Sequence, residues 1–172
     1  MDLATILFTP SDPIQTHALV FLLGSLAVSS LSDLRRMAAQ ADFYEVWIAF
    51  TAAMFLFDLY LGMTGQLTIP PFTLKWILIL AFTAVSTATP LLNISTMDVA
   101  ALAALLSTLN PATILLTIPL TILANELLHP LLKKHGQAGA YPFLPTVLTV
   151  NLTLLTLNLT GGIQQYLGIT GL

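Results

Sequence analysis

The chain lacks cysteine altogether and carries very little charge. None of its 172 residues is cysteine, which excludes disulfides, thiolate metal sites and a thiol nucleophile. Only 8% of the residues are charged, whereas soluble domains carry roughly a quarter. The eight acids and five bases are scattered, which argues against a nucleic-acid surface. No Lys or Arg precedes the first apolar run, so we expect no cleaved secretory signal and treat residue 1 as part of the mature protein.

Hydrophobic residues take the place of the missing charge. They make up 56% of the chain, and the mean hydropathy is +0.90, which indicates a membrane protein. Several spans of ~20 residues would use nearly the whole chain, so we predict one all-α transmembrane domain over residues 1–172. The apolar runs predict six helices, at residues 14–31, 44–61, 74–92, 99–109, 112–128 and 143–159.

Two of the breaks between these runs have the composition of turns. The stretch Gly62–Pro71 is rich in glycine and proline and predicts a turn. Asn110 followed by Pro111 predicts a helix start, with the asparagine as N-cap and the proline at the first helical position.

The fourth run is short for a transmembrane helix. Its ~11 residues rise only ~16 Å, whereas the hydrocarbon core is ~30 Å thick. Either this run is a short helix sheltered by its neighbours, or residues 99–128 form one kinked span. Basic residues favour the first alternative, because cytoplasmic loops are enriched in them. With six spans and the N-terminus outside, the inner loops hold Arg35, Arg36, Lys133 and Lys134, and only Lys75 lies outside.

Two acids stand at the same predicted membrane face, Asp33 where the first span ends and Asp98 where the fourth begins. Each has a structural explanation: Asp33 as a water-facing residue that ends a helix, and Asp98 as a favourable charge in a first helical turn capped by Ser95 or Thr96. Together they support chemistry, because two adjacent carboxylates share one proton and can activate water against a peptide carbonyl. Such a dyad requires no metal and no cofactor.

The remaining acids have simpler explanations. Asp58 is predicted to be solvated at the outer interface, while Asp42 and Glu45 complement the dipole at the start of the second helix. Glu126, late in the fifth span, is the third catalytic candidate. The three histidines show no metal-ligand spacing, and the chain has no G-x-S-x-G motif for a serine nucleophile.

Three stretches resemble the type IV prepilin peptidases, in particular the short archaeal branch that includes preflagellin peptidases. Residues 32–50, SDLRRMAAQADFYEVWIAF, are similar to the first family motif, in which a catalytic aspartate closes the first helix. Residues 95–106, STMDVAALAALL, resemble the second motif, where a Gly-x-Gly-Asp turn leads into an apolar helix. Residues 141–151, YPFLPTVLTVN, resemble the Pro-Phe-x-Pro stretch that opens the last helix.

The resemblance implies an aspartic endopeptidase of six or more helices, with Asp33 and Asp98 as the catalytic pair at the cytoplasmic face of the cell membrane. The implied substrate is a precursor of a type IV pilin-like or archaellum subunit, cut before its hydrophobic helix. The chain departs from the family pattern at Ser95 and Met97, where glycines are expected, at Asn151, where a glycine often comes, and in lacking a lysine after Asp98. The zinc segment and N-methyltransferase activity of bacterial members require cysteines and do not carry over.

Two other function classes stay open. The missing glycines suggest a family member that has lost catalysis and serves as a membrane scaffold. A small transporter would instead place acids near the midplane at broken helices, and only Asp58 and Glu126 approach that description.

Overall fold

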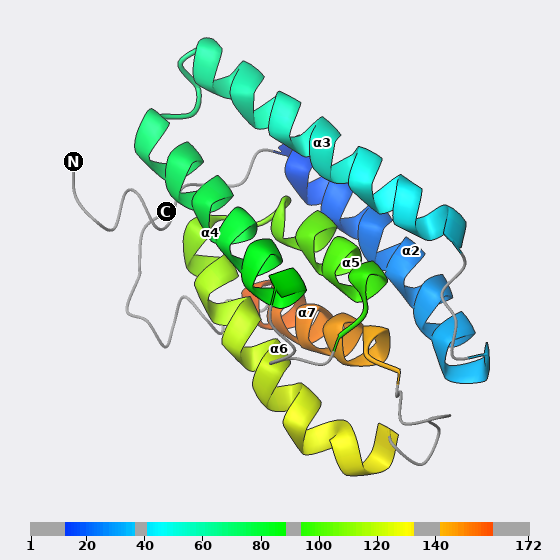
Figure 1. Cartoon of the computed structure of the whole chain (residues 1–172). Coiled ribbons are helices and arrows are strands. Elements are labelled where there is room, and N and C mark those ends of the chain that lie inside the picture. Colours follow the sequence, from blue (N-terminus) through cyan, green and yellow to red (C-terminus); the bar gives the residue numbers. More distant parts are fainter. Residues whose placement is uncertain (1–12, 37–40, 89–93, 133–141, 160–172) are drawn as a thin grey trace.

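A computed structural model describes residues 13–36, 41–88, 94–132 and 142–159, and every regular element in these ranges is an α-helix (Figure 1). This confirms the all-α class. The helices are α2 (Pro13–Arg36), α3 (Ala41–Met63), α4 (Ile69–Ala88), α5 (Thr96–Leu106), α6 (Pro111–Leu132) and α7 (Leu144–Leu159).

Four of these helices are long and apolar enough to cross a membrane. They are α2, α3, α4 and α6, with 24, 23, 20 and 22 residues. At 1.5 Å per residue, about 20 residues match the ~30 Å hydrocarbon core. The other two helices are also apolar but shorter, with 11 residues in α5 and 16 in α7.

The turn between α3 and α4 is shorter than the predicted Gly62–Pro71 break. α4 begins at Ile69 and holds Pro71 in its first turn, where proline is tolerated because the N–H has no helical partner. The chain reverses at Gly65, whose φ of 76° is a conformation that favours glycine.

The break between α5 and α6 confirms the prediction at Asn110. Its side-chain oxygen accepts a hydrogen bond of 2.8 Å from the backbone N–H of Thr113, and Pro111 is the first residue of α6. α5 and α6 are therefore separate helices, and the alternative of one kinked span over residues 99–128 is wrong.

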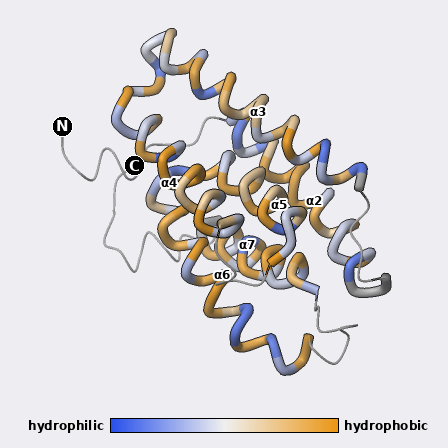
Figure 2. The backbone as a smooth tube through the Cα atoms, in the orientation of Figure 1, coloured by the Kyte–Doolittle hydropathy of each residue, from blue (hydrophilic) through white to orange (hydrophobic). Residues whose placement is uncertain are grey.

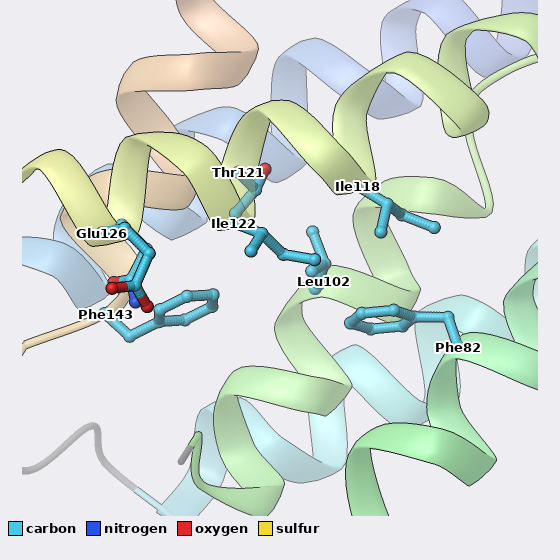
Figure 3. Close-up of a pocket in the computed structure, with 8 residues that line it drawn as sticks. Phe82, Leu102, Ile118, Thr121, Ile122, Glu126 and Phe143 are labelled. Carbon is cyan, nitrogen blue, oxygen red and sulfur yellow. The ribbon is translucent and has the colours of Figure 1, made fainter. Parts of the chain in front are cut away.

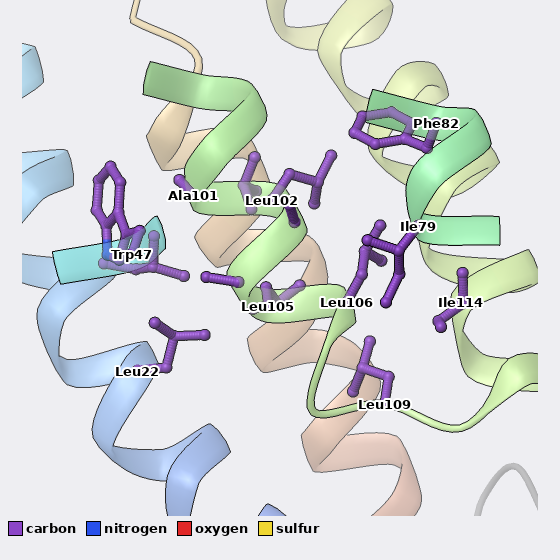
Figure 4. Close-up of a cluster of buried hydrophobic side chains, with 14 of the residues drawn as sticks. Leu22, Trp47, Ile79, Phe82, Ala101, Leu102, Leu105, Leu106, Leu109 and Ile114 are labelled. Atoms are coloured by element: carbon purple, nitrogen blue, oxygen red, sulfur yellow. The ribbon is translucent and has the colours of Figure 1, made fainter. Parts of the chain in front are cut away.

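α5 lies at the centre of the bundle, in contact with α2, α3, α4 and α7 (Figures 1 and 4). Alanines at 101, 103 and 104 allow the neighbouring helices to approach closely. Large side chains then pack around them, including the fully buried Trp47 of α3. The short fourth run is therefore a helix sheltered by its neighbours.

The outer surface of the bundle is apolar. The exposed fractions of Phe21 on α2 and Leu127 on α6 are both 70%, and that of Leu80 on α4 is 65%. Hydrophobic residues run along the helices, and hydrophilic residues gather near several helix ends (Figure 2). Large apolar side chains that point outward from several helices fit a lipid environment, consistent with a multi-pass membrane protein.

The helices alternate in direction, so the bundle has two distinct ends. α2 ends where α5 and α7 begin, and we call this the Asp33 end (Figure 1). At the opposite end α2 begins and the turn joins α3 to α4. We call it the Asp58 end.

Candidate active site

Asp33 lies in the last turn of α2 and is largely covered by protein. Its exposed fraction is 9%, and Ser29 and Ser30 on the preceding turn are also buried. α2 packs against α7. The explanation of Asp33 as a water-facing residue is therefore wrong.

The partner of Asp33 is the first turn of α7. A helix begins with N–H groups that have no acceptor within the helix. Pro142 and Pro145 contribute no N–H, so the donors between them are the backbone N–H groups of Phe143 and Leu144. Both donate to the Asp33 carboxylate. The Asp33 side chain thus caps the start of α7, where the helix dipole favours a negative charge.

This contact gives the Pro-Phe-x-Pro stretch a physical role. Its two prolines flank the pair of N–H groups that hold Asp33. In the sequence, the stretch is distinguished only by its resemblance to a family motif, which does not predict its contact with Asp33.

Asp98 lies in the first turn of α5 and takes part in a capping box. Its backbone N–H donates to Ser95 Oγ at 3.2 Å, and its Oδ2 accepts from the backbone N–H and the hydroxyl of Ser95 at 2.9 and 2.8 Å. Ser95 is therefore the N-cap, while Thr96 is the first helical residue. The box uses only Oδ2, so Oδ1 is not part of the cap.

The structure brings Asp33 and Asp98 together although two complete helices separate them in the sequence. The negative charge of Asp98 acts on the Asp33 carboxyl group, so the two side chains lie within electrostatic range of each other. Each is held by neutral donors at a helix start, Asp33 at α7 and Asp98 at α5. The resulting site is a pair of acids at the Asp33 end of the bundle.

Glu126, the third candidate, lies on the exposed surface of α6. It lines a small pocket between α4, α5 and α6 (Figure 3). Phe143 lines the same pocket with its side chain, and its backbone N–H faces Asp33. Phe143 therefore contacts both this pocket and Asp33. The pocket is lined by Phe82, Leu102, Ile118, Thr121, Ile122, Asn125, Glu126 and Phe143.

Asp58 is fully buried, and the prediction that it is solvated at the interface is wrong. Its Oδ2 lies 2.7 Å from the ammonium nitrogen of Lys75 and accepts a hydrogen bond of 3.0 Å from Trp76 Nε1. Its Oδ1 accepts a hydrogen bond from the Gln15 amide. The Lys75 ammonium also lies 5.7 Å from the centre of the Trp76 ring. Three helices thus meet at a neutralised ion pair.

The other polar candidates lie outside the acid pair. Asp42 is in the first turn of α3, where it complements the helix dipole, and Glu45 is exposed on the same helix. Within the described ranges, no group of three or more His, Asp or Glu side chains is arranged to hold a metal ion. His135 and the two lysines at 133 and 134 lie outside the described residues.

Comparison with known proteins identifies no relative. No protein family, curated protein sequence or solved structure matches the chain.

Proposed function

We propose that the protein is a membrane aspartic endopeptidase in which Asp33 and Asp98 act as a catalytic pair. The observation that supports this function best is that the carboxyl groups of Asp33 on α2 and Asp98 on α5 lie at the same end of the bundle, within electrostatic range of each other. Two such acids hold a single proton between them, so that one acts as a base and the other as an acid.

The pair would hydrolyse a peptide bond with water as the only co-reactant. The ionised carboxylate takes a proton from water as the water oxygen attacks the carbonyl carbon, and the protonated acid donates to the carbonyl oxygen. Collapse of this intermediate breaks the carbon–nitrogen bond, and the nitrogen leaves with a proton returned by the pair. The products are one carboxylic acid and one amine.

The proposed substrate follows from the resemblance to prepilin and preflagellin peptidases. It is the precursor of a type IV pilin-like or archaellum subunit, with a short basic segment before a hydrophobic helix. Such a helix lies in the bilayer against the apolar surface of the enzyme, while the basic segment stays in water. The bond between them is then level with acids at a membrane face.

The proposed topology has six crossings, the N-terminus outside and the acid pair at the cytoplasmic face of the cell membrane. The positive-inside rule supports it, because Arg35 and Arg36 end α2 at the Asp33 end, and this topology puts the loop with Lys133 and Lys134 on the same side. Lys75 is the one basic residue that this topology was expected to leave outside. Since Lys75 is buried against Asp58, it is not a loop charge and does not oppose this orientation.

Replacement of either acid by asparagine tests the function. Asn keeps an oxygen that accepts the same hydrogen bonds, so Asp33→Asn and Asp98→Asn are expected to accumulate as folded protein. Each is expected to slow cleavage of a co-expressed precursor about 10³-fold or more, because the proton transfer is lost. Glu45→Gln, which changes an exposed acid on α3 outside the acid pair, is the matched control. Retained cleavage in either Asp variant contradicts the assignment.

A catalytically inactive scaffold is the second candidate, and the capping box at Asp98 favours it. Ser95 and Met97 replace the glycines of the family motif, and Asp98 already has a structural partner in Ser95. For a scaffold, purified wild-type protein and both Asn variants would be indistinguishable in a cleavage assay. Any precursor cleavage that depends on Asp33 excludes it.

A further inference from the structure

Glu126 is a charged residue on an apolar surface. It is exposed on α6, and its neighbours along that helix, Ile122, Leu123 and Leu127, are exposed apolar side chains that fit a lipid environment. No described residue forms a hydrogen bond or an ion pair with the Glu126 carboxylate. Ionisable residues in membrane-spanning helices are rare, and they usually pair with another group or line a site. An unpaired acid in this position therefore requires an explanation.

Other acids of the described helices have structural roles that Glu126 lacks. Asp58 pairs with Lys75, and Asp98 belongs to the capping box of α5. An acid also stabilises a helix when it lies in the first turn, near the positive end of the helix dipole. Glu126 lies in the second half of α6 (Pro111–Leu132), where the dipole offers no such stabilisation.

The pocket beside Glu126 has an acidic end and an apolar end. α6 runs toward the Asp33 end of the bundle, so Glu126 lies nearer to that end than Ile118 does. Glu126 and Phe143 lie together at one end of the pocket, while Ile118 and Phe82 lie at the other (Figure 3). A ligand that fits both ends has a positive charge toward the Asp33 end and apolar groups deeper in the bundle.

The pocket adjoins both acids of the pair. Phe143 lines it with its side chain, and the backbone N–H of Phe143 donates to Asp33. Leu102 lines it from α5 and lies one turn after Asp98, on the same face of that helix. A peptide segment in this pocket therefore has its neighbouring residues beside the acid pair.

We propose that Glu126 and this pocket bind a peptide in which a lysine or arginine precedes a hydrophobic helix. The positive side chain pairs with Glu126 beside the ring of Phe143. The first apolar residue of the helix packs deeper in the pocket, against Leu102 and Phe82. The order of charge and apolar groups along the pocket thus matches their order along the peptide. Selection of a cleaved substrate rests on the proposed function, whereas binding of the peptide does not.

An exposed acid near a membrane face can also be solvated by water alone. The two explanations differ in the partner that the carboxylate requires. If only water solvates Glu126, its replacement by glutamine leaves peptide binding unchanged. If Glu126 binds a cation, the same replacement weakens binding only of peptides that carry the charge.

A binding measurement tests the site without any cleavage. The probe is a synthetic peptide with two lysines before a helix of about 20 leucines and alanines, and its control has glutamines in place of the lysines. Both are titrated in detergent against the full chain with Asp33→Asn, which prevents hydrolysis. We expect Glu126→Gln to raise the Kd of the lysine peptide about tenfold and to leave that of the glutamine peptide unchanged. Glu45→Gln on α3 should change neither.

Two further variants test the charge and the shape of the site. Glu126→Lys should prefer a peptide with glutamates over the lysine peptide, which reverses the original preference. Ile122→Trp fills the pocket and should abolish the preference for lysine, whereas Leu123→Trp, at the adjacent exposed position outside the pocket, should keep it. Equal Kd values for the lysine and glutamine peptides, no reversal by Glu126→Lys, or equal effects of the two tryptophans overturn the site.

A kinetic measurement then connects the site to cleavage. With a cleaved precursor, Glu126→Gln is expected to raise KM about tenfold at unchanged kcat, because it removes binding that the ground state and the transition state share. A lowered kcat would place Glu126 in the chemistry and overturn its role in binding. Charge-dependent peptide binding without any wild-type cleavage retains the site and rejects the peptidase. Wild-type cleavage with an unchanged KM in Glu126→Gln rejects the site alone.

Discussion

The aspartates at the two ends of the bundle have opposite electrostatic surroundings. At the Asp58 end, one aspartate is fully buried beside the ammonium group of Lys75 at 2.7 Å, and two further side chains donate to it. At the Asp33 end, two aspartates lie within electrostatic range of each other, one held by a serine and the other by backbone N–H groups. One site contains a neutral ion pair, and the other brings like charges together.

This difference separates structural from chemical roles. At the Asp58 end the ammonium group balances the charge of the carboxylate, and the ion pair joins α2, α3 and α4 where they meet. In the proposed mechanism, the two acids at the Asp33 end share one proton, which is the requirement for acid–base chemistry. Loss of charge at the Asp58 end should therefore cost stability, and at the Asp33 end it should cost cleavage.

The largest effect on stability is expected for Lys75→Met. The change leaves Asp58 buried without its counter-charge, which costs about 3–5 kcal/mol of unfolding free energy. Unfolding in detergent measures it. The double variant Asp58→Asn with Lys75→Met removes both charges and should recover most of the loss. A single Lys75→Met variant as stable as the wild type would show that the ion pair is not structural.

A smaller loss is expected for Trp76→Phe. The ring is largely retained, but the N–H that donates to Asp58 at 3.0 Å is lost. Removal of a hydrogen bond to a charged group costs about 1.5–3 kcal/mol. Thermal unfolding measures the loss. Trp47→Phe on α3 removes only a 3.4 Å hydrogen bond to the neutral Ser25 hydroxyl and should lose less. Unchanged cleavage by the folded Trp76→Phe protein would confirm that the two ends are independent.

The smallest of these losses is expected for Ser95→Ala at the Asp33 end. The N-cap of α5 is lost at a cost of about 1 kcal/mol, while the Asp98 carboxyl group remains. Precursor cleavage should therefore persist in Ser95→Ala at a temperature where the protein is folded. Loss of cleavage equal to that of Asp98→Asn would mean that the hydroxyl of Ser95 is itself part of the chemistry.

Hydropathy and helix-capping residues were sufficient to predict the helices and the separation of α5 from α6. They also placed Asp33 and Asp98 at the same end. Asp58 was misjudged because it was considered alone. Lys75 stands about as far after the connecting turn as Asp58 stands before it, so an antiparallel hairpin brings opposite charges to the same depth. Charges at matching depth in adjacent helices were the signal that could have revealed the pair.

The contact between Asp33 and α7 was beyond the reach of local patterns. It joins the end of the first described helix to the start of the last, and it depends on which N–H groups two prolines leave without a partner. Sequence periodicity indicates which face of a helix is apolar, but it does not indicate which helix covers that face. The tertiary arrangement determines the partner.

Cross-linking between positions 33 and 98 tests the central claim most directly. The chain has no cysteine, so the double variant Asp33→Cys with Asp98→Cys carries only the two thiols of interest. In native membranes, we predict that a short thiol cross-linker joins them and that both are labelled from the same side. The Thr64→Cys with Asp98→Cys variant, which uses an exposed residue of the α3–α4 turn and spans both ends, should not be joined. Failure of the first pair to cross-link, or labelling from opposite sides, would contradict the account.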